Sequence, residues 1–339
     1  MIHIPITIVG FGMAGQFLLS HITQIVSRNQ ISIIDPDFIG GDLQRHYSSI
    51  HSNTTIQQTV TALDSLPTIW SQASKLIQLK GESKSTLPLG LLTSEIHHVG
   101  ISLLDGCTCH YDTLNRAQWD SDKNKWNLIL LNGASYTTDI ICLCTGILPR
   151  QEDYGIPTIP LSKALNFVGL QPILRSGDTV TVLGSSHSGT LILKNLKEIP
   201  NINTTCIYKT QPFKYAKDGN ANGIKEESAA IADSIQRGDY TSLKMISTND
   251  LPALSKTFRT SSWIIQATGF KASFPDLIDS SGIRYTYTWD QVTGKSLTME
   301  SVYAFGACVT NQQGDVSIGA FAEQLKTRWP TLLERLKSI

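Results

Sequence analysis

Three glycines near the start of the chain, Gly10, Gly12 and Gly15, have the spacing of a turn that brings a peptide backbone close to a pyrophosphate. They follow an apolar run at residues 7–9 and lead into another at residues 16–19, which predicts a strand, a tight turn and a helix. Gly10 would permit the turn, Gly12 the approach of the phosphates, and Gly15 the close packing of helix on strand. The free N–H groups and the dipole at the helix N-terminus would favour negative charge. The residues predicted to bind here are Gly10, Gly12, Met13, Ala14 and Gly15.

An acidic residue follows the next apolar run, residues 31–34. Asp35 lies about 20 residues beyond the glycines, where a carboxylate can bind the ribose hydroxyls of a dinucleotide. Pro36 stands beside it and is included in the predicted site. The alternative is a strand, turn and helix that bind no ligand, in which case the position of Asp35 would be a coincidence. The strand, the helix and the acid together predict a dinucleotide site.

The same pattern returns in the second half of the chain. Residues 179–183 read as a strand, residues 190–193 as the opening of a helix, and residues 204–209 as a second strand. Ser186 takes the place of the middle glycine, but it is small and offers a hydroxyl to a phosphate. His187 either touches a phosphate or faces solvent. The predicted second turn comprises Gly184, Ser185, Ser186, His187, Ser188 and Gly189.

The acid expected after the second strand of this repeat is missing. Lys209 and Thr210 occupy its place, and Lys214 follows. A cation there suits the 2′-phosphate of NADPH, so Lys209 is predicted to favour NADPH, with NADH as the alternative. Lysines that only meet solvent are the other interpretation of this stretch.

Three later apolar strands end in small residues. They are expected over residues 140–144, 262–266 and 302–305. Glycine at such a strand end lets the backbone pass close under a bound nucleotide, where a side chain would clash. The strand ends predicted to line the two sites are Thr145 with Gly146, Thr268 with Gly269, and Gly306 with Ala307.

The composition argues against several other classes of protein. Among 339 residues, 28 Lys and Arg balance 28 Asp and Glu, so no net field favours nucleic acid or an anionic membrane. No apolar stretch reaches the length of a membrane-spanning helix. Residues 1–5 lack the basic and apolar regions of a signal peptide. The expectation is a soluble cytoplasmic protein, and its hydrophobic content of 41% is enough for packed cores.

The six cysteines indicate neither a redox pair nor a metal site. None forms a C-x-x-C pair, and Cys142 and Cys144 fall within a predicted strand, where they read as small apolar residues. Cys107 and Cys109 lie near His110, but their spacing fits no standard zinc site. No metal is therefore expected.

Coarser patterns place the remaining elements. Apolar positions at helical spacing predict a helix over residues 61–79 and a C-terminal amphipathic helix over residues 315–337. Residues 96–104 and 108–114 read as short strands. The irregular stretch 155–176 reads as the link between the two halves.

Two glycine-rich turns, two Thr-Gly strand ends and the late Tyr303-Ala304-Phe305-Gly306 strand resemble the flavoproteins with two dinucleotide-binding domains. That group includes thioredoxin-reductase-like enzymes, ferredoxin–NADP reductases of the same fold, and flavin-containing and N-hydroxylating monooxygenases. The resemblance covers nearly the whole chain and implies an α/β fold of two Rossmann-like domains, the second inserted in the first. It implies FAD in a domain formed by residues 1–155 and 290–339, and NAD(P)H in a domain formed by residues 156–289.

The resemblance also implies roles for single residues. Thr145 and Gly146 would flank FAD, and Gly306 would lie near its ribityl chain. Asn53 and His51 would lie at the edge of the flavin. The helix over residues 315–337 begins at Asp315, and its N-terminus would point at an electron-rich ligand edge.

Two departures from the family pattern, and two similarities to its branches, bear on the activity. The Cys pair of the disulfide reductases is absent, which argues against dithiol–disulfide chemistry. The late strand reads Gly306-Ala307 where the reductases have Gly-Asp, which either loosens FAD binding or points to the monooxygenases. The Gly-Gly-Asp-Leu stretch at residues 40–43 is similar to both monooxygenases and ferredoxin reductases, whereas Ser188-Gly189 is more typical of the monooxygenases.

The implied function is that of an FAD-dependent NAD(P)H oxidoreductase of the monooxygenase kind. Hydride would pass from NADPH to the flavin, and electrons would then pass to oxygen and a small substrate. One alternative is a reductase that passes electrons to ferredoxin, a cytochrome or a quinone; another is an FAD-binding redox sensor or a degenerate, non-catalytic relative. The partner is thus a small-molecule substrate or electron acceptor and not a nucleic acid. A homodimer is among the oligomeric states left open.

Overall fold

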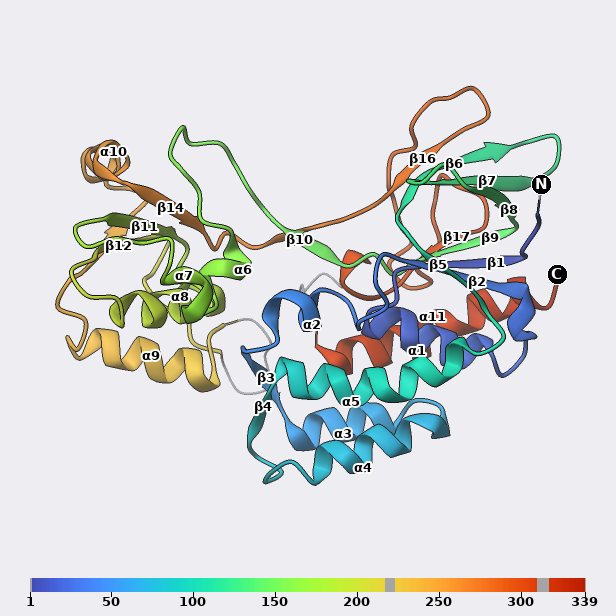
Figure 1. The fold of residues 1–339 in the computed structure, drawn as a ribbon, viewed down its shortest axis with the longest axis horizontal. Coiled ribbons are helices and arrows are strands. Elements are labelled where there is room, and N and C mark those ends of the chain that lie inside the picture. Colours follow the sequence, from blue (N-terminus) through green and yellow to red (C-terminus); the bar gives the residue numbers. More distant parts are fainter. Residues whose placement is uncertain (1, 217–222, 310–316, 339) are drawn as a thin grey trace. The chain divides into compact units, whose positions relative to one another are not determined.

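The computed structural model describes residues 2–216, 223–309 and 317–338 (Figure 1). The chain divides into two compact units. Unit 1 comprises Met1–Ser48, Thr54–Ile147 and Ala272–Ile339, and unit 2 comprises Ser49–Asn53 and Leu148–Lys271. Most of unit 2 is therefore an insertion in the sequence of unit 1.

Unit 1 is built on a five-stranded parallel sheet in the order β17-β9-β1-β2-β5. Its central strands are largely apolar because both faces of a parallel sheet are covered, and every residue of β1, β2 and β9 is buried. Ile6 lies beside Ile31 on one neighbouring strand and Ile140 on the other. The strands are β1 (Ile6–Val9), β2 (Ile31–Asp35), β5 (Thr108–Tyr111), β9 (Ile140–Leu143) and β17 (Val302–Ala304).

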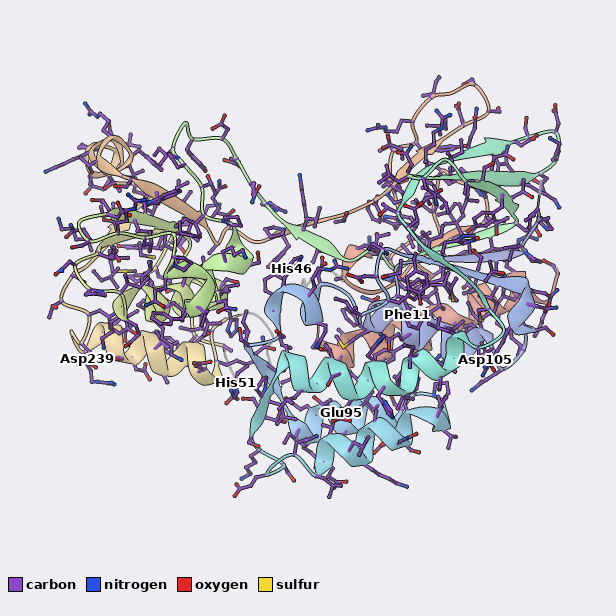
Figure 2. The ribbon with its side chains drawn as sticks, viewed as in Figure 1. Phe11, His46, His51, Glu95, Asp105 and Asp239 are labelled. Carbon is purple, nitrogen blue, oxygen red and sulfur yellow. The ribbon has the colours of Figure 1, made fainter. Side chains whose placement is uncertain are left out.

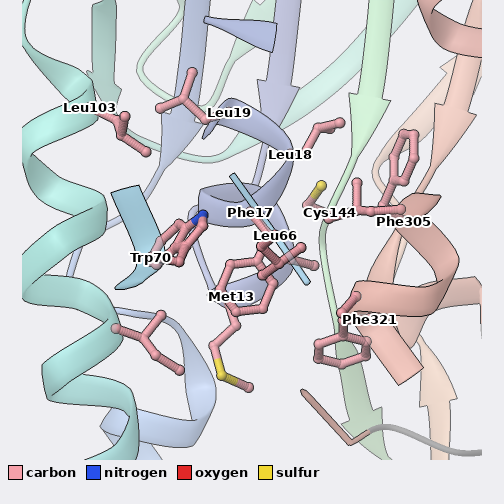
Figure 3. Packing of buried hydrophobic residues seen from close by; sticks show 14 of the residues in the cluster. Met13, Phe17, Leu18, Leu19, Leu66, Trp70, Leu103, Cys144, Phe305 and Phe321 are labelled. Atoms are coloured by element: carbon pink, nitrogen blue, oxygen red, sulfur yellow. The ribbon is translucent and has the colours of Figure 1, made fainter. Parts of the chain in front are cut away.

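Helices pack on one face of this sheet and enclose the larger core (Figure 1). Phe17 and Trp70 meet there edge to face, with ring centroids 4.8 Å apart (Figure 3). The helical elements are α1 (Met13–Ile22), η1 (Arg28–Gln30), α2 (Asp42–Tyr47), α3 (Ile56–Asp64), η2 (Thr68–Trp70), α4 (Ser71–Gln78), α5 (Leu89–Ile101), η3 (Ser102–Leu104), η4 (Gly306–Val309) and α11 (Ile318–Leu336).

A four-stranded sheet in the order β16-β6-β7-β8 packs on the other face of the parallel sheet. Trp126 and Leu128 on β7 are fully buried there against Ile141 and Leu143 on β9. Neighbours β6, β7 and β8 pair antiparallel, whereas β16 runs parallel to β6. The strands are β6 (Leu114–Asp120), β7 (Lys125–Leu130), β8 (Ser135–Thr138) and β16 (Asp276–Ile278).

A short ladder joins β3 (His51–Thr55) to β4 (Thr86–Pro88).

Unit 2 has its own four-stranded parallel sheet in the order β13-β12-β11-β14. In the register, Val182 on β11 lies beside Cys206 on β12 and Ile265 on β14. The elements are α6 (Leu161–Ala164), α7 (Phe167–Leu170), β11 (Thr179–Leu183), α8 (His187–Lys197), β12 (Asn203–Tyr208), α9 (Glu226–Gln236), β13 (Leu243–Ser247), α10 (Leu251–Thr260) and β14 (Trp263–Gln266).

The borders of the two units differ from the domain borders expected at residues 155 and 289. Residues 272–289 belong to unit 1, because β16 pairs with β6, and residues 148–155 belong to unit 2. The chain passes between the units in β10 (Ile147–Pro149) and β15 (Phe270–Ala272), and these two strands pair with each other.

Two local predictions were wrong. Residues 96–104 are helical and not a strand, because Leu92, Ile96 and Val99 recur at helical spacing and form the buried side of α5. The helix predicted over residues 61–79 is two helices, α3 and α4, separated at Pro67, where a helix interior would lose a hydrogen bond. The C-terminal helix is present from Ile318, whereas its expected start at Asp315 lies outside the described residues.

No helix in the described ranges combines the length and the apolar character needed to cross a bilayer.

The buried pair of Phe17 and Trp70 gives a test of the core. Trp70 is 0% exposed, and its Nε1 donates to Ser20 Oγ at 2.8 Å. Trp70→Ala should lower the free energy of unfolding by about 3–5 kcal/mol, because it leaves a cavity. The matched control is Ile69→Ala at a neighbouring position that is 36% exposed, where the loss should stay below about 1 kcal/mol. Urea unfolding would measure both, and equal losses would contradict this packing.

Candidate dinucleotide-binding sites

The first glycine-rich turn is packed so tightly that only glycine fits at two of its positions. Gly10 has a φ of +98°, and a Cβ there would lie 2.4 Å from the carbonyl oxygen of Cys144. A Cβ on Gly15 would lie 2.1 Å from the carbonyl oxygen of Gly10. Both distances are shorter than any van der Waals contact, so the turn, the start of α1 and the end of β9 depend on these glycines.

Two further glycines bring other loops against the N-terminus of α1. Gly41 has a φ of +80°, and a Cβ there would lie 3.0 Å from Cα of Gly12. Gly306 has a φ of +77°, and a Cβ there would lie 2.5 Å from Cβ of Ala14. The loop before α2 and the start of η4 therefore flank the turn without side chains of their own.

The N-terminus of α1 is left open for an anion. Its N-cap residue is Gly12, no side chain caps it, and its first turn holds no acid. Helix α3, by contrast, is closed by Thr55, whose side chain accepts from Gln58 N. Uncapped N–H groups and the helix dipole suit a phosphate group. The first turn of unit 1 thus fits the pyrophosphate of a dinucleotide.

The side chain of Asp35 holds the turn by accepting hydrogen bonds from backbone N–H groups. It is 5% exposed, and its Oδ2 accepts from Phe11 N at 2.7 Å. Its Oδ1 accepts from Phe38 N at 2.8 Å and Asp37 N at 3.2 Å. The backbone of Phe11 (labelled in Figure 2) is also held at its carbonyl by Gln16, whose Nε2 donates to Phe11 O at 3.0 Å. Contact between Asp35 and a ribose stays a prediction.

Two features beside Asp35 were not found from the sequence. Gln16 is fully buried in α1, and a polar residue inside an apolar helix was the available signal. His97 on α5 lies edge-on to Phe11, with ring centroids 6.3 Å apart. Its Nδ1 is buried without a hydrogen-bond partner among the residues described. Burial lowers the pKa of His97, and the charge of Asp35 acts against that shift.

The strand ends at Thr145 and Gly306 meet through Cys308. Thr145 Oγ1 donates to Ser273 O. The Cys308 thiol donates to Leu143 O at 3.4 Å and to Phe305 O at 3.2 Å, and burial raises its pKa. The last residue of β9 and the residue before Gly306 are therefore joined through Cys308.

The second turn repeats the geometry of the first. Gly184 has a φ of +100°, and a Cβ there would lie 2.4 Å from Ala267 O. A Cβ on Gly189 would lie 2.1 Å from Gly184 O. Helix α8 begins after Ser186 with no side-chain cap and no acid in its first turn. Ser185 and Ser188 complete this turn, and Thr268 and Gly269 follow the strand that packs against it. The turn of unit 2 fits a second pyrophosphate.

His187 is half-buried, and contact between its ring and a phosphate stays a prediction. It is the first residue of α8, and its ring bonds to the backbone of Gly223. Its Nε2 is buried and has no partner among the described residues. Burial lowers the pKa of His187. The ring therefore joins the turn to the segment before α9 and does not simply face solvent.

A pocket of about 270 Å³ opens beside the second turn. Its described lining comprises Ser185, Ser186, Gln211, Lys214 and Gly223. Lys209 is exposed and its carbonyl accepts from Thr248 Oγ1 at 3.2 Å, but it does not belong to this lining. Lys214, and not Lys209, therefore belongs to the described lining of this pocket.

The flavin-edge candidates lie on β3. His51 (labelled in Figure 2) and Asn53 are exposed and belong to the segment Ser49–Asn53, which groups with unit 2. Their proximity to a flavin stays a prediction. Pro36 lies next to Asp35, and Ala307 packs against the larger core of unit 1. Across the described chain, no cluster of three or more His, Cys, Asp or Glu side chains has a metal-binding arrangement.

Solved structures share this fold over the whole chain. The flavin-containing monooxygenase from Stenotrophomonas maltophilia superimposes with a TM-score of 0.68 at 15% identity, covering 100% of this chain and 99% of that one. The fold is that of the flavoproteins with two dinucleotide-binding domains. The α/β fold predicted from the sequence is thereby confirmed.

Two other structures of this fold have different activities. Bacillithiol disulfide reductase from Staphylococcus aureus gives a TM-score of 0.65 at 11% identity, covering 99% of each chain. Cyclohexanone monooxygenase from Rhodococcus sp. Phi1 bound to NADP⁺ gives 0.64 at 12% identity, covering 98% of this chain and 85% of that one. The shared fold therefore does not select one reaction.

One curated protein is similar in sequence. Monooxygenase AgnR1 from Paecilomyces divaricatus is 26% identical over 219 residues, covering 57% of this chain and 54% of that protein. The match thus spans about half the length of that relative. No family model matches the chain.

Asp35→Asn tests whether the carboxylate holds the turn. An amide would set an N–H donor against a backbone N–H of Phe11 or Phe38, so the free energy of unfolding of the cofactor-free protein should fall by about 1–3 kcal/mol. Asp42→Asn, at a half-buried residue bonded to Arg45, should change it by less than about 0.5 kcal/mol. If Asp35→Asn weakened FAD binding without this loss of stability, the carboxylate would act mainly as a ligand of the ribose.

Proposed function

We propose that this protein is an FAD-dependent, NADPH-using oxidoreductase of the monooxygenase kind. The observation that carries the proposal is the repeated turn. Gly10 makes a close contact with Gly15, and Gly184 makes the matching contact with Gly189. Each contact lies at the N-terminus of a helix that no side chain caps. Two such turns suit two different dinucleotides within one chain.

Unit 1 would hold FAD and unit 2 would hold NADPH. Gly12, Ala14 and the N-terminus of α1 would bind the FAD pyrophosphate. Ser185, Ser186 and the N-terminus of α8 would bind that of NADPH, with Lys214 beside the extra phosphate. Bound FAD would supply the redox chemistry, accepting a hydride and passing electrons to oxygen and a small substrate. The protein would supply position, electrostatics and exclusion of water.

The cysteines favour oxygen chemistry over disulfide chemistry. All six are free, and burial raises the pKa of Cys142, Cys144 and Cys206, which makes them poor nucleophiles. Free thiols also suit a reducing compartment, which supports the cytoplasm as the location. The monooxygenase similarity over about half of AgnR1 supports the same reaction class, with a small-molecule substrate.

The visible spectrum of the purified protein tests the cofactors directly. We expect a flavin band that bleaches after anaerobic addition of NADPH, because the two turns would bind donor and acceptor. Oxygen uptake should then rise with a substrate from a panel of amines and ketones. Faster reduction of ferredoxin, a cytochrome or a quinone than of oxygen would identify a reductase. A flavin band that neither nicotinamide bleaches would identify a sensor, and no band after incubation with FAD would reject the proposal.

The pocket beside the second turn gives a test of cofactor preference. Lys214→Gln should raise the dissociation constant of NADP⁺ about tenfold, because it removes a cation near the 2′-phosphate. The dissociation constant of NAD⁺ should stay within about twofold. Lys244→Gln, at an exposed position on β13, is the control, and fluorescence titration is the measurement. A larger effect of Lys209→Gln than of Lys214→Gln would restore the interpretation made from the sequence.

A further inference from the structure

A buried arginine lies behind the strand end at Gly306. Arg328 on α11 is 2% exposed. Its guanidinium donates to Ala304 O at 2.9 Å, Val309 O at 3.3 Å and Gln291 O at 3.4 Å. It also donates to the side chain of Gln324 at 3.3 Å. All four acceptors are neutral oxygens.

Within the described residues, no carboxylate forms an ion pair with Arg328. The charge of Asp290 acts on Arg328, and Oδ1 of Asp290 accepts from the backbone N–H groups of Val292 and Thr293. Burial lowers the pKa of Arg328, and an arginine still keeps its proton. A buried charge without an ion-pair partner costs free energy, so we expect Arg328 to have a role beyond packing.

The sequence makes room for this side chain. A Cβ on Gly294 would lie 2.7 Å from Cδ of Arg328 and 2.7 Å from Ala304 O. Gln324 then links the arginine to the strand end, because its Oε1 accepts from Gly306 N at 2.8 Å. Its Nε2 donates to Val309 O at 3.3 Å. The charge thus lies directly behind η4, whose first residue touches Ala14 at the open end of α1.

We propose that Arg328 and Gln324 are positioning residues that place a buried positive charge behind η4 and thereby favour the reduced form of a bound flavin. The inference rests on the proposed function. A hydride from NADPH carries two electrons and one proton and leaves NADP⁺, so the flavin site must accept one additional negative charge. A fixed cation in a site of low dielectric constant stabilises such charge without rearrangement.

The test measures the equilibrium between oxidised and reduced flavin in the holoenzyme against a reference dye. Arg328→Gln removes the charge and should lower the equilibrium constant for reduction at least about threefold. Arg328→Lys keeps the charge but loses the planar fork, so it should restore most of that constant while remaining less stable. Gln324→Glu keeps the arginine and neutralises it, so it should also lower the constant.

Arg335→Gln is the matched control. Arg335 is a half-buried cation seven residues further along α11, with its Nε donating to Ser301 Oγ at 3.1 Å. Arg335 lies two helical turns from Arg328 on the same face of α11. Because Arg335 bonds to Ser301 and not to η4, loss of its charge should leave the equilibrium constant unchanged within error.

The outcomes separate this inference from the proposed function. A wild-type protein that binds no flavin would reject the proposed function and with it this role. A flavin-loaded wild type in which Arg328→Gln and Gln324→Glu lower only the unfolding free energy would overturn the electrostatic role and leave the proposed function intact. If Arg328→Gln does not fold, Gln324→Glu decides, because it retains the arginine and the acceptor for Gly306 N.

Discussion

The fold of both units depends on one steric constraint, the close approach of a helix to the backbone of a turn. In unit 1 the carbonyl of Gly10 occupies space that a Cβ on Gly15 would need, and in unit 2 Gly184 and Gly189 stand in the same relation. Because no side chain separates helix from strand, the first N–H groups of α1 and α8 lie at the carboxyl edge of each sheet. Packing and anion binding thus arise from the same residues.

Buried side chains secure the first turn from below. Asp35 accepts from the N–H of Phe11, and Gln16 donates to its carbonyl oxygen. Gln324 and Arg328 bind the backbone at η4 and at the end of β17. These polar groups are buried and bonded to the backbone. The first turn is therefore supported from below, an arrangement suited to preorganised binding.

The sequence predicted the parts that depend on local pattern. Glycine spacing and apolar strands located both turns, because these features are local and can be recognised within a few residues. The sequence could not show that Asp35 bonds to Phe11, or that Lys214 and not Lys209 lines the pocket, because those contacts depend on how loops fold back. Residues 96–104 were assigned to a strand from their apolar content, although the spacing of Ile96 and Val99 belonged to a helix.

The insertion of unit 2 has a consequence for synthesis on the ribosome. Strand β17 pairs with β9, with Val302 beside Ile141, so the sheet of unit 1 joins segments that leave the ribosome far apart in time. All of Leu148–Lys271 emerges between them, and unit 2 can fold while one edge of β9 still has no neighbour. Nascent chains paused in this interval would expose an unpaired strand edge, which makes them clients for chaperones.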